Sequence, residues 1–183
     1  FTYIKIGGPA RYFVQVGSVA ELENAVRSAL RLNIPCRVLG GGANVLVADK
    51  GYDGLLIRNI TSNVSVVGDK VTVSAGYNLT KLAGEAGKNG LSGLEFAFGI
   101  PGTVGGAIYG NAGSFGGEMK DILVSANVLF PDGVRELSNS DFGFQYRHSV
   151  LKEEDRYGIV LDAVLRLKEG DPQAIDALHK ERL

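Results

Sequence analysis

The chain has 183 residues, of which 45% are hydrophobic and 21% are charged, and its formal net charge is -1. This composition is typical of a folded domain, and the near-neutral charge disfavours binding to nucleic acid or to an anionic membrane surface. Cys36 is the only cysteine, which excludes an internal disulfide and a cysteine metal site and favours the reducing cytoplasm. No apolar run reaches membrane-spanning length.

The N-terminal third of the sequence predicts a small strand-helix-strand lobe. Residues 12–16 read as a strand, and Ser18 followed by Glu21 forms a capping-box pattern that opens an amphipathic helix. A strand over residues 36–39 then leads into a glycine turn. Further short apolar segments follow at residues 45–47 and 55–57.

The remainder of the sequence predicts a larger lobe of mixed helices and strands. Two hairpins are indicated, over residues 64–75 and 122–137, each around a short turn. Asn78 can cap a helix that closes at Asn89-Gly90. Residues 159–167 alternate between apolar and more polar positions, as a half-buried strand does. The expected fold class is therefore α+β.

These patterns predict three parts of the chain. We expect one lobe over residues 1–62, a second over residues 63–170, and a capped helix over residues 171–183. Both ends of the sequence are abrupt, which suggests a piece of a longer protein.

The first chemical signal is a glycine turn at the carboxyl end of the 36–39 strand. The sequence Gly40-Gly41-Gly42-Ala43-Asn44 can bend sharply and aim successive backbone N–H groups at an anion such as a pyrophosphate. A tight structural turn is an equally simple interpretation. The turn lacks the Gly-Lys-Ser/Thr of a Walker loop and the following helix of a Rossmann fingerprint.

A second, longer glycine-rich run spans residues 99–117. This density of glycine is costly to fold unless the backbone packs against something flat or charged, so a ligand is favoured. A pair of helices packed through their glycines is the alternative.

Tyr146 and Arg147 form a third cluster, just before the 159–167 strand. A guanidinium could hold an anionic substrate or stabilise a developing enolate, although from these residues alone a surface ion pair with Asp141 or Glu153 is the preferred interpretation. His148 and His179 lack the spacing of metal ligands, so we expect solvated or hydrogen-bonded side chains and no metal site.

Taken together, the ordered motifs resemble the UDP-N-acetylenolpyruvoylglucosamine reductases. The resemblance covers nearly the whole chain, and its motifs are Ile6 to Ala10, Leu39 to Leu46, Gly99 to Ala107, Asn111 to Gly113 and Tyr146 to Ser149. It implies a two-lobed FAD-binding fold of the vanillyl-alcohol-oxidase type, with a small βαβ lobe and a larger mixed lobe. It also implies NADPH as hydride donor and a sugar-nucleotide substrate, with no obligate protein partner.

The resemblance also implies roles for particular residues. Tyr146 and Arg147 match the substrate-contacting pair, and Arg147 would stabilise the enolate. FAD would be held noncovalently, because neither glycine loop contains a cysteine or a histidine. The residues that would contact FAD are Gly40, Gly41, Gly42, Ala43, Asn44, Val45, Pro101, Gly102, Thr103, Gly105, Gly106, Asn111, Ala112, Gly113 and Ile159.

The sequence departs from the family at two points. Ala43 stands where the family commonly has serine, which removes a hydroxyl contact but leaves every backbone N–H. The family's proton-donating serine and enolate-stabilising glutamate lie in a C-terminal domain that would begin after Leu183, so we expect the chain alone to be inactive. Another FAD-dependent oxidase or dehydrogenase of the same fold, or a non-catalytic FAD-binding module, stays open.

Overall fold

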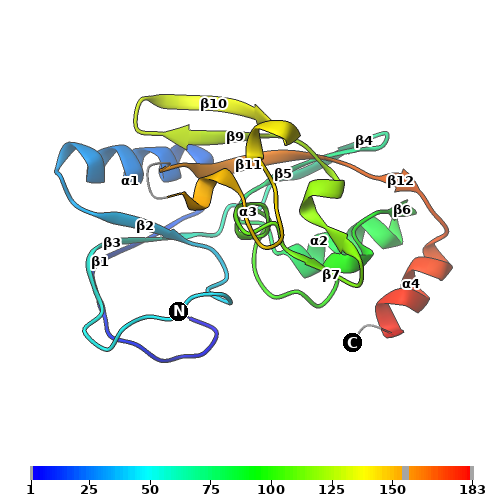
Figure 1. Cartoon of the computed structure of the whole chain (residues 1–183), viewed down its shortest axis with the longest axis horizontal. Helices are drawn as coiled ribbons and strands as arrows, with labels where there is room; N and C mark the ends of the chain where they lie inside the picture. The colour runs from blue at the N-terminus through cyan, green and yellow to red at the C-terminus, as the bar shows by residue number, and fades with distance from the viewer. Residues whose placement is uncertain (1, 154–156, 182–183) are drawn as a thin grey trace.

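The structure is a computed structural model that describes residues 2–153 and 157–181. Its elements form two lobes side by side, the small lobe at the left of Figure 1 and the large lobe at the right. The small lobe consists of β1 Ala10–Val16, α1 Val19–Arg31, β2 Cys36–Leu39 and β3 Tyr52–Asn59. Its three strands are parallel and lie in the order β1-β3-β2.

The capping box that opens α1 is confirmed. The Ser18 hydroxyl accepts from the Glu21 N–H at 3.2 Å, and the Glu21 carboxylate accepts from the Ser18 N–H at 3.3 Å. The expected apolar segment at residues 45–47 forms no strand, because it belongs to the loop between β2 and β3. Leu46 in this loop is 76% exposed. The Leu46 side chain therefore does not pack into the small sheet.

The large lobe is built on a five-stranded antiparallel sheet in the order β10-β9-β11-β5-β4. Both predicted hairpins are present in it, as β4 with β5 and β9 with β10. The elements of the lobe are β4 Val64–Val67, β5 Lys70–Ser74, α2 Leu79–Lys88, β6 Leu91–Ser92, α3 Val104–Tyr109, β7 Gly113–Ser114, β8 Gly117–Glu118, β9 Leu123–Phe130, β10 Gly133–Ser138, β11 Ile159–Arg166, β12 Lys168–Glu169 and α4 Pro172–Glu181.

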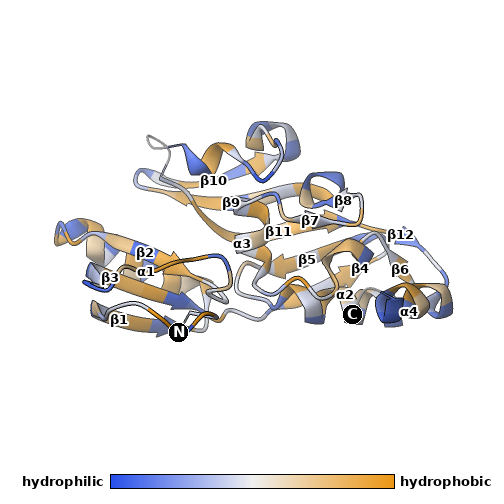
Figure 2. Cartoon of the chain, turned by 60° about the horizontal axis from the view of Figure 1, so that its bottom comes forward, coloured by the Kyte–Doolittle hydropathy of each residue, from blue (hydrophilic) through white to orange (hydrophobic). Residues whose placement is uncertain are grey.

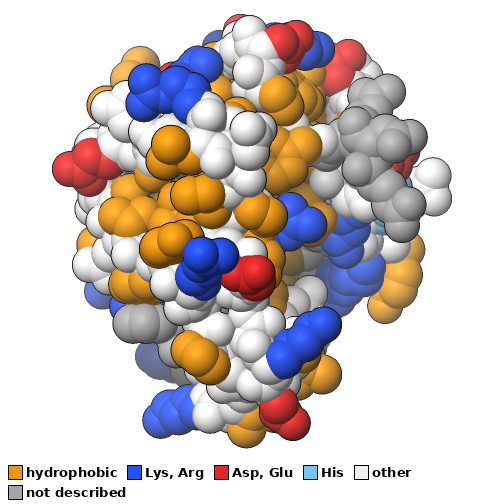
Figure 3. All heavy atoms as spheres, turned by 90° about the vertical axis from the view of Figure 1, so that its left-hand side faces the viewer, with side chains coloured by type: hydrophobic (Ala, Val, Ile, Leu, Met, Phe, Trp, Pro, Cys, Tyr) orange, Lys and Arg blue, Asp and Glu red, His pale blue; other side chains and the backbone are white. Residues whose placement is uncertain are grey.

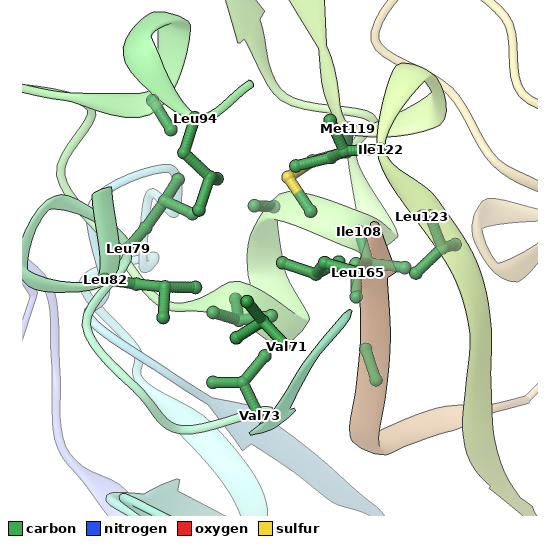
Figure 4. Close-up of a cluster of buried hydrophobic side chains, with 14 of the residues drawn as sticks. Val71, Val73, Leu79, Leu82, Leu94, Ile108, Met119, Ile122, Leu123 and Leu165 are labelled. Atoms are coloured by element: carbon green, nitrogen blue, oxygen red, sulfur yellow. The ribbon is translucent and has the colours of Figure 1, made fainter. Parts of the chain in front are cut away.

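The main core lies between the large sheet and the helices α2 and α3. Figure 2 shows hydrophobic residues along β9 and β11, in the middle of the molecule. Figure 4 shows how side chains from both layers meet: Val71 and Val73 of β5 and Leu165 of β11 lie close to Leu82 of α2 and Ile108 of α3. This packing fixes α3, and with it the glycine-rich run, against the sheet.

A second core joins the two lobes. Leu22 and Val26 of α1 belong to the same buried cluster as Leu129 of β9 and Ile159 and Leu161 of β11. Helix α1 therefore contacts the large sheet as well as the small one. Because interiors are close-packed, this shared core holds the lobes in a fixed relation and defines the space between them.

The core packing predicts that Leu165→Ala strongly destabilises the folded chain. Leu165 is fully buried in β11, and its truncation should lower the free energy of unfolding by about 2–5 kcal/mol. The adjacent Arg166 points outward, where its guanidinium pairs with Asp69 at 3.4 Å, so Arg166→Ala should cost less than about 1 kcal/mol. Urea denaturation of both variants measures the difference. Equal losses of unfolding free energy in the two variants would contradict the burial of Leu165 in the core.

Candidate functional site

A cleft of about 1750 Å³ lies between the lobes. Its walls come from the N-terminal segment, the β2–β3 loop, the glycine-rich run and the start of β11. The cleft lining includes all but one of the predicted FAD-contacting residues, namely Gly40, Gly41, Gly42, Ala43, Asn44, Val45, Pro101, Gly102, Thr103, Gly105, Gly106, Ala112, Gly113 and Ile159. The exception is Asn111.

The two glycine loops come into direct contact at the floor of the cleft. A Cβ atom added at Gly40 would lie 2.2 Å from Thr103 Oγ1, and one added at Gly41 would lie 2.9 Å from Gly102 Cα. Both distances are below any ordinary carbon contact. Glycine at positions 40 and 41 is therefore what allows the loop of the small lobe to meet the loop of the large lobe.

The β2–β3 loop presents an uninterrupted series of backbone donors. None of the N–H groups of residues 40–47 donates a hydrogen bond to an acceptor in the described parts of the chain. Gly42 has a φ of +64°. Its carbonyl accepts a hydrogen bond from the Tyr3 N–H at 2.9 Å, which connects the turn to the N-terminal segment. Successive free N–H groups around a left-handed glycine form an anion-binding concavity, so this loop fits the pyrophosphate of FAD.

The glycine-rich run over residues 99–117 forms a second wall of the cleft. The N–H groups of Val104 and Gly105 donate to the carbonyls of Tyr77 and Ala75 at 3.0 and 2.8 Å, which ties α3 to the end of β5. Gly105 packs against Ala75, where an added Cβ would lie 2.7 Å from the alanine Cβ. Gly102, with a φ of +132°, has nothing within 4 Å of its added Cβ. The run thus combines close packing on one side with a side-chain-free surface toward the cleft.

Asn111 lies behind this wall. Its buried side-chain amide donates to the Glu118 carboxylate and, at 2.9 Å, to the Gln145 carbonyl, while its oxygen accepts from the Lys120 N–H at 3.0 Å. The neighbouring Ala112 and Gly113 line the cleft. In this structure the Asn111 side chain supports the wall, and a direct contact with the cofactor stays a prediction.

Arg147 lies on a tight turn and lines the cleft; its contact with a substrate stays a prediction. The backbones of Gln145 and His148 exchange two hydrogen bonds of 3.1 Å, which places Tyr146 and Arg147 at the tip. The Arg147 guanidinium donates to the Gly113 carbonyl at 2.5 Å and lies 5.3 Å from the centre of the Tyr146 ring.

The ion-pair interpretation of Arg147 is not supported in the described chain. Asp141 accepts from the Ser138 hydroxyl and N–H, and no ion pair joins Arg147 to Asp141 or Glu153 within the described residues. Tyr146 is 84% exposed and lies outside the cleft lining. Of the two predicted substrate residues, the structure brings only Arg147 to the cleft wall.

The cleft is positively charged although the whole chain is not. Among the described residues its lining holds four cationic side chains, Lys5, Arg37, Arg147 and Lys152, and one carboxylate, Glu153. Figure 3, which views the molecule from the small-lobe side, shows both basic and acidic side chains around the hydrophobic ones on that face. Such a lining suits a ligand that carries phosphate or carboxylate groups.

Sequence patterns missed several polar residues of the lining, among them Arg37, Tyr52 and Tyr157. The Tyr157 hydroxyl lies 2.9 Å from the Cys36 sulfur and links the start of β11 to β2 across the lobes. Burial and this hydrogen bond raise the pKa of Tyr157, and burial likewise raises the pKa of Tyr52. Both phenols therefore stay neutral near pH 7. The sequence signal that could have found two of these residues is their position along the chain. Arg37 lies in the predicted 36–39 strand, and Tyr157 lies just before the predicted 159–167 strand.

The two histidines lie outside the cleft lining. The His179 ring is buried and stacks on Phe98, with ring centres 3.9 Å apart, so its role there is packing. The described residues contain no cluster of three His, Cys, Asp or Glu side chains that could hold a metal ion. No helix of the described chain is long and apolar enough to span a membrane.

A family model described as an FAD binding domain matches residues 10–138. The chain belongs to this family. FAD is therefore the cofactor of this chain, and the FAD-binding fold predicted from the sequence is confirmed.

Relatives of the chain are consistent with the resemblance seen in the sequence. The UDP-N-acetylenolpyruvoylglucosamine reductase of Anoxybacillus flavithermus is 45% identical over 185 residues, which cover 99% of this chain and 61% of that protein. A crystal structure of the corresponding reductase from Thermus caldophilus is 37% identical, with a TM-score of 0.85 over 98% of this chain and 64% of that chain.

A more distant structure shares the fold alone. Alkyldihydroxyacetonephosphate synthase is 24% identical, with a TM-score of 0.66 over 86% of this chain and 31% of that chain. The chain spans about three fifths of the length of the curated reductases that it matches.

Proposed function

We propose that the chain is the flavin-binding part of a reductase that converts UDP-N-acetylglucosamine enolpyruvate to UDP-N-acetylmuramate, in the cytoplasm, for peptidoglycan synthesis. The observation that carries this proposal is the position of Arg147, which lines the cleft beside the glycine loops and donates to the Gly113 carbonyl. The similarity to the named reductases over almost the whole chain supports the same substrate class.

When bound, FAD would supply the hydride-transfer chemistry between NADPH and the enolpyruvyl double bond. The described residues would bind the cofactor. The N–H groups of residues 40–47 would hold the pyrophosphate, and the glycine surface at 102–106 would allow a flat ring to lie close to the backbone.

Arg147 would act on the substrate. Hydride arrival at the enolpyruvyl group places negative charge on the carbon next to its carboxylate, and a fixed guanidinium stabilises that charge without reorganisation. The hydrogen bond to Gly113 supplies this fixation. The proton that completes the reduction would come from a residue outside this chain, since the resemblance places the proton-donating serine in the C-terminal domain.

The substrate proposal is tested with the full-length gene product. Its flavin is reduced with NADPH and then mixed with the enolpyruvyl sugar nucleotide or with small hydroxy acids and their oxo acids. Reoxidation by the enolpyruvyl sugar nucleotide alone supports the proposal. A reduced enzyme that this substrate leaves unchanged, and that an oxo acid reoxidises, belongs to a different flavin enzyme of the same fold.

We predict that the flavin is FAD and that it is bound noncovalently. The cleft extends from the anion-binding loop to the glycine wall, which suits a dinucleotide, and its described lining contains no cysteine or histidine for a covalent linkage. Acid denaturation followed by mass spectrometry should find FAD in the supernatant and an unmodified polypeptide. FMN in the supernatant, or flavin retained on the polypeptide, would contradict this.

A further inference from the structure

The backbone of Arg147 adopts an unfavourable conformation. Its φ is +55°, in the left-handed region that a residue with a Cβ atom seldom occupies. Such a conformation persists only where surrounding contacts hold it, and these contacts cluster at functional sites. The two hydrogen bonds between Gln145 and His148 close the turn but leave the carbonyl of Arg147 itself to another partner.

That partner is Lys152. Its ammonium donates to the Arg147 carbonyl at 2.6 Å and lies 5.8 Å from the centre of the Tyr109 ring. Lys152 is exposed, and its backbone ends the short 3-10 helix Val150–Lys152. Ser149, just before this helix, is fully buried and donates to the Tyr109 carbonyl at 2.7 Å. Tyr109, Arg147 and Lys152 all line the cleft.

We propose that Lys152 is a positioning residue for Arg147, an inference that rests on the proposed function of Arg147. The arginine is held at two points, through its guanidinium on Gly113 and through its carbonyl on Lys152. A hydrogen bond from a charged donor is stronger than one between neutral groups, so the ammonium compensates for the unfavourable backbone. Without it, the turn relaxes and the guanidinium loses its fixed position at the cleft wall.

The first test uses the FAD-loaded chain and needs no substrate. Amide hydrogen exchange is measured at Gln145 and His148, whose N–H groups close the turn. Lys152→Met should accelerate this exchange about tenfold, because it removes one charged hydrogen bond. Lys152→Arg, which keeps the charge and donor, should restore most of the protection. Lys70→Met, at an exposed lysine of β5, is the matched control and should change nothing.

The second test measures reoxidation of the reduced flavin by the enolpyruvyl substrate in the full-length gene product. Lys152→Met should slow this step about tenfold on its own and cause little further loss in an Arg147→Ala background. If the rate losses of Lys152→Met and Arg147→Ala multiply in the double variant, Lys152 acts independently of Arg147, and the proposal is overturned. Unchanged amide exchange in Lys152→Met would overturn it as well. If the wild-type protein does not use this substrate, the proposed function fails, while amide exchange still decides the role of Lys152.

Discussion

Arg147→Ala in the full-length gene product should slow reoxidation of the reduced flavin by the enolpyruvyl substrate by about a hundredfold to a thousandfold. This is the range expected when one fixed electrostatic contact to a developing anion is removed. The structure gives the reason for the size of the effect, because the guanidinium is already held at the cleft wall by Gly113. Reduction of the flavin by NADPH should change much less.

Rapid-mixing spectroscopy follows the two half-reactions separately, and two further variants complete the experiment. Arg147→Lys keeps a charge but loses the planar fork, so it shows which of the two properties the substrate requires. Arg135→Ala removes an exposed arginine that pairs with Asp132 outside the cleft lining, and serves as the control. If NADPH reduction collapses in Arg147→Ala while reoxidation is unchanged, the arginine serves the nucleotide and its assigned role is wrong.

Gly41→Val should weaken FAD binding on the order of a hundredfold. An added Cβ at this position would lie 2.9 Å from Gly102 Cα, so the larger side chain forces the two glycine loops apart. The free protein can relieve this clash by moving the two loops apart. FAD needs both loops in place, so we expect the cost to appear mainly in cofactor affinity and the flavin to dissociate before the chain unfolds.

Titration of FAD into the flavin-free variant, with thermal unfolding followed in parallel, measures both quantities. Gly17→Val is the matched control, because an added Cβ there meets only the Glu21 carboxylate, at 3.8 Å. It should leave FAD affinity unchanged. Normal FAD affinity in Gly41→Val, or unfolding that precedes flavin loss, would show that the loop is a structural turn only.

The parts of the fold that the sequence predicted correctly depend on local interactions. The capping box of α1 and the hairpin turns at residues 68–69 and 131–133 are each determined by a few neighbouring residues. A helix in the glycine-rich run, where the structure has α3, is only the alternative interpretation of the sequence, because glycine disfavours helices and its density there favours a ligand loop. Its stability comes from distant contacts, above all the hydrogen bond from Gly105 to Ala75 and the burial of Ile108.

The candidate site also combines residues that local sequence patterns reveal with contacts that they do not reveal. The glycine loops and Arg147 could be recognised because their residue types are unusual in their positions and resemble known motifs. The contact between Gly40 and Thr103, and the link between Cys36 and Tyr157, join segments far apart in the chain. No local pattern predicts such pairs. Lys152 is close to Arg147 in sequence, but only the left-handed turn explains why its ammonium reaches that carbonyl.

Titration of FAD and FMN into the purified, flavin-free chain tests the central claim most directly. The cleft joins an anion-binding loop to a glycine wall, and FMN lacks the adenosine and the pyrophosphate that would occupy the first of these. We expect FAD to bind at one site per chain and FMN to bind more weakly by at least about tenfold. Equal affinity for the two flavins, or no binding of FAD, would contradict the assignment of this cleft.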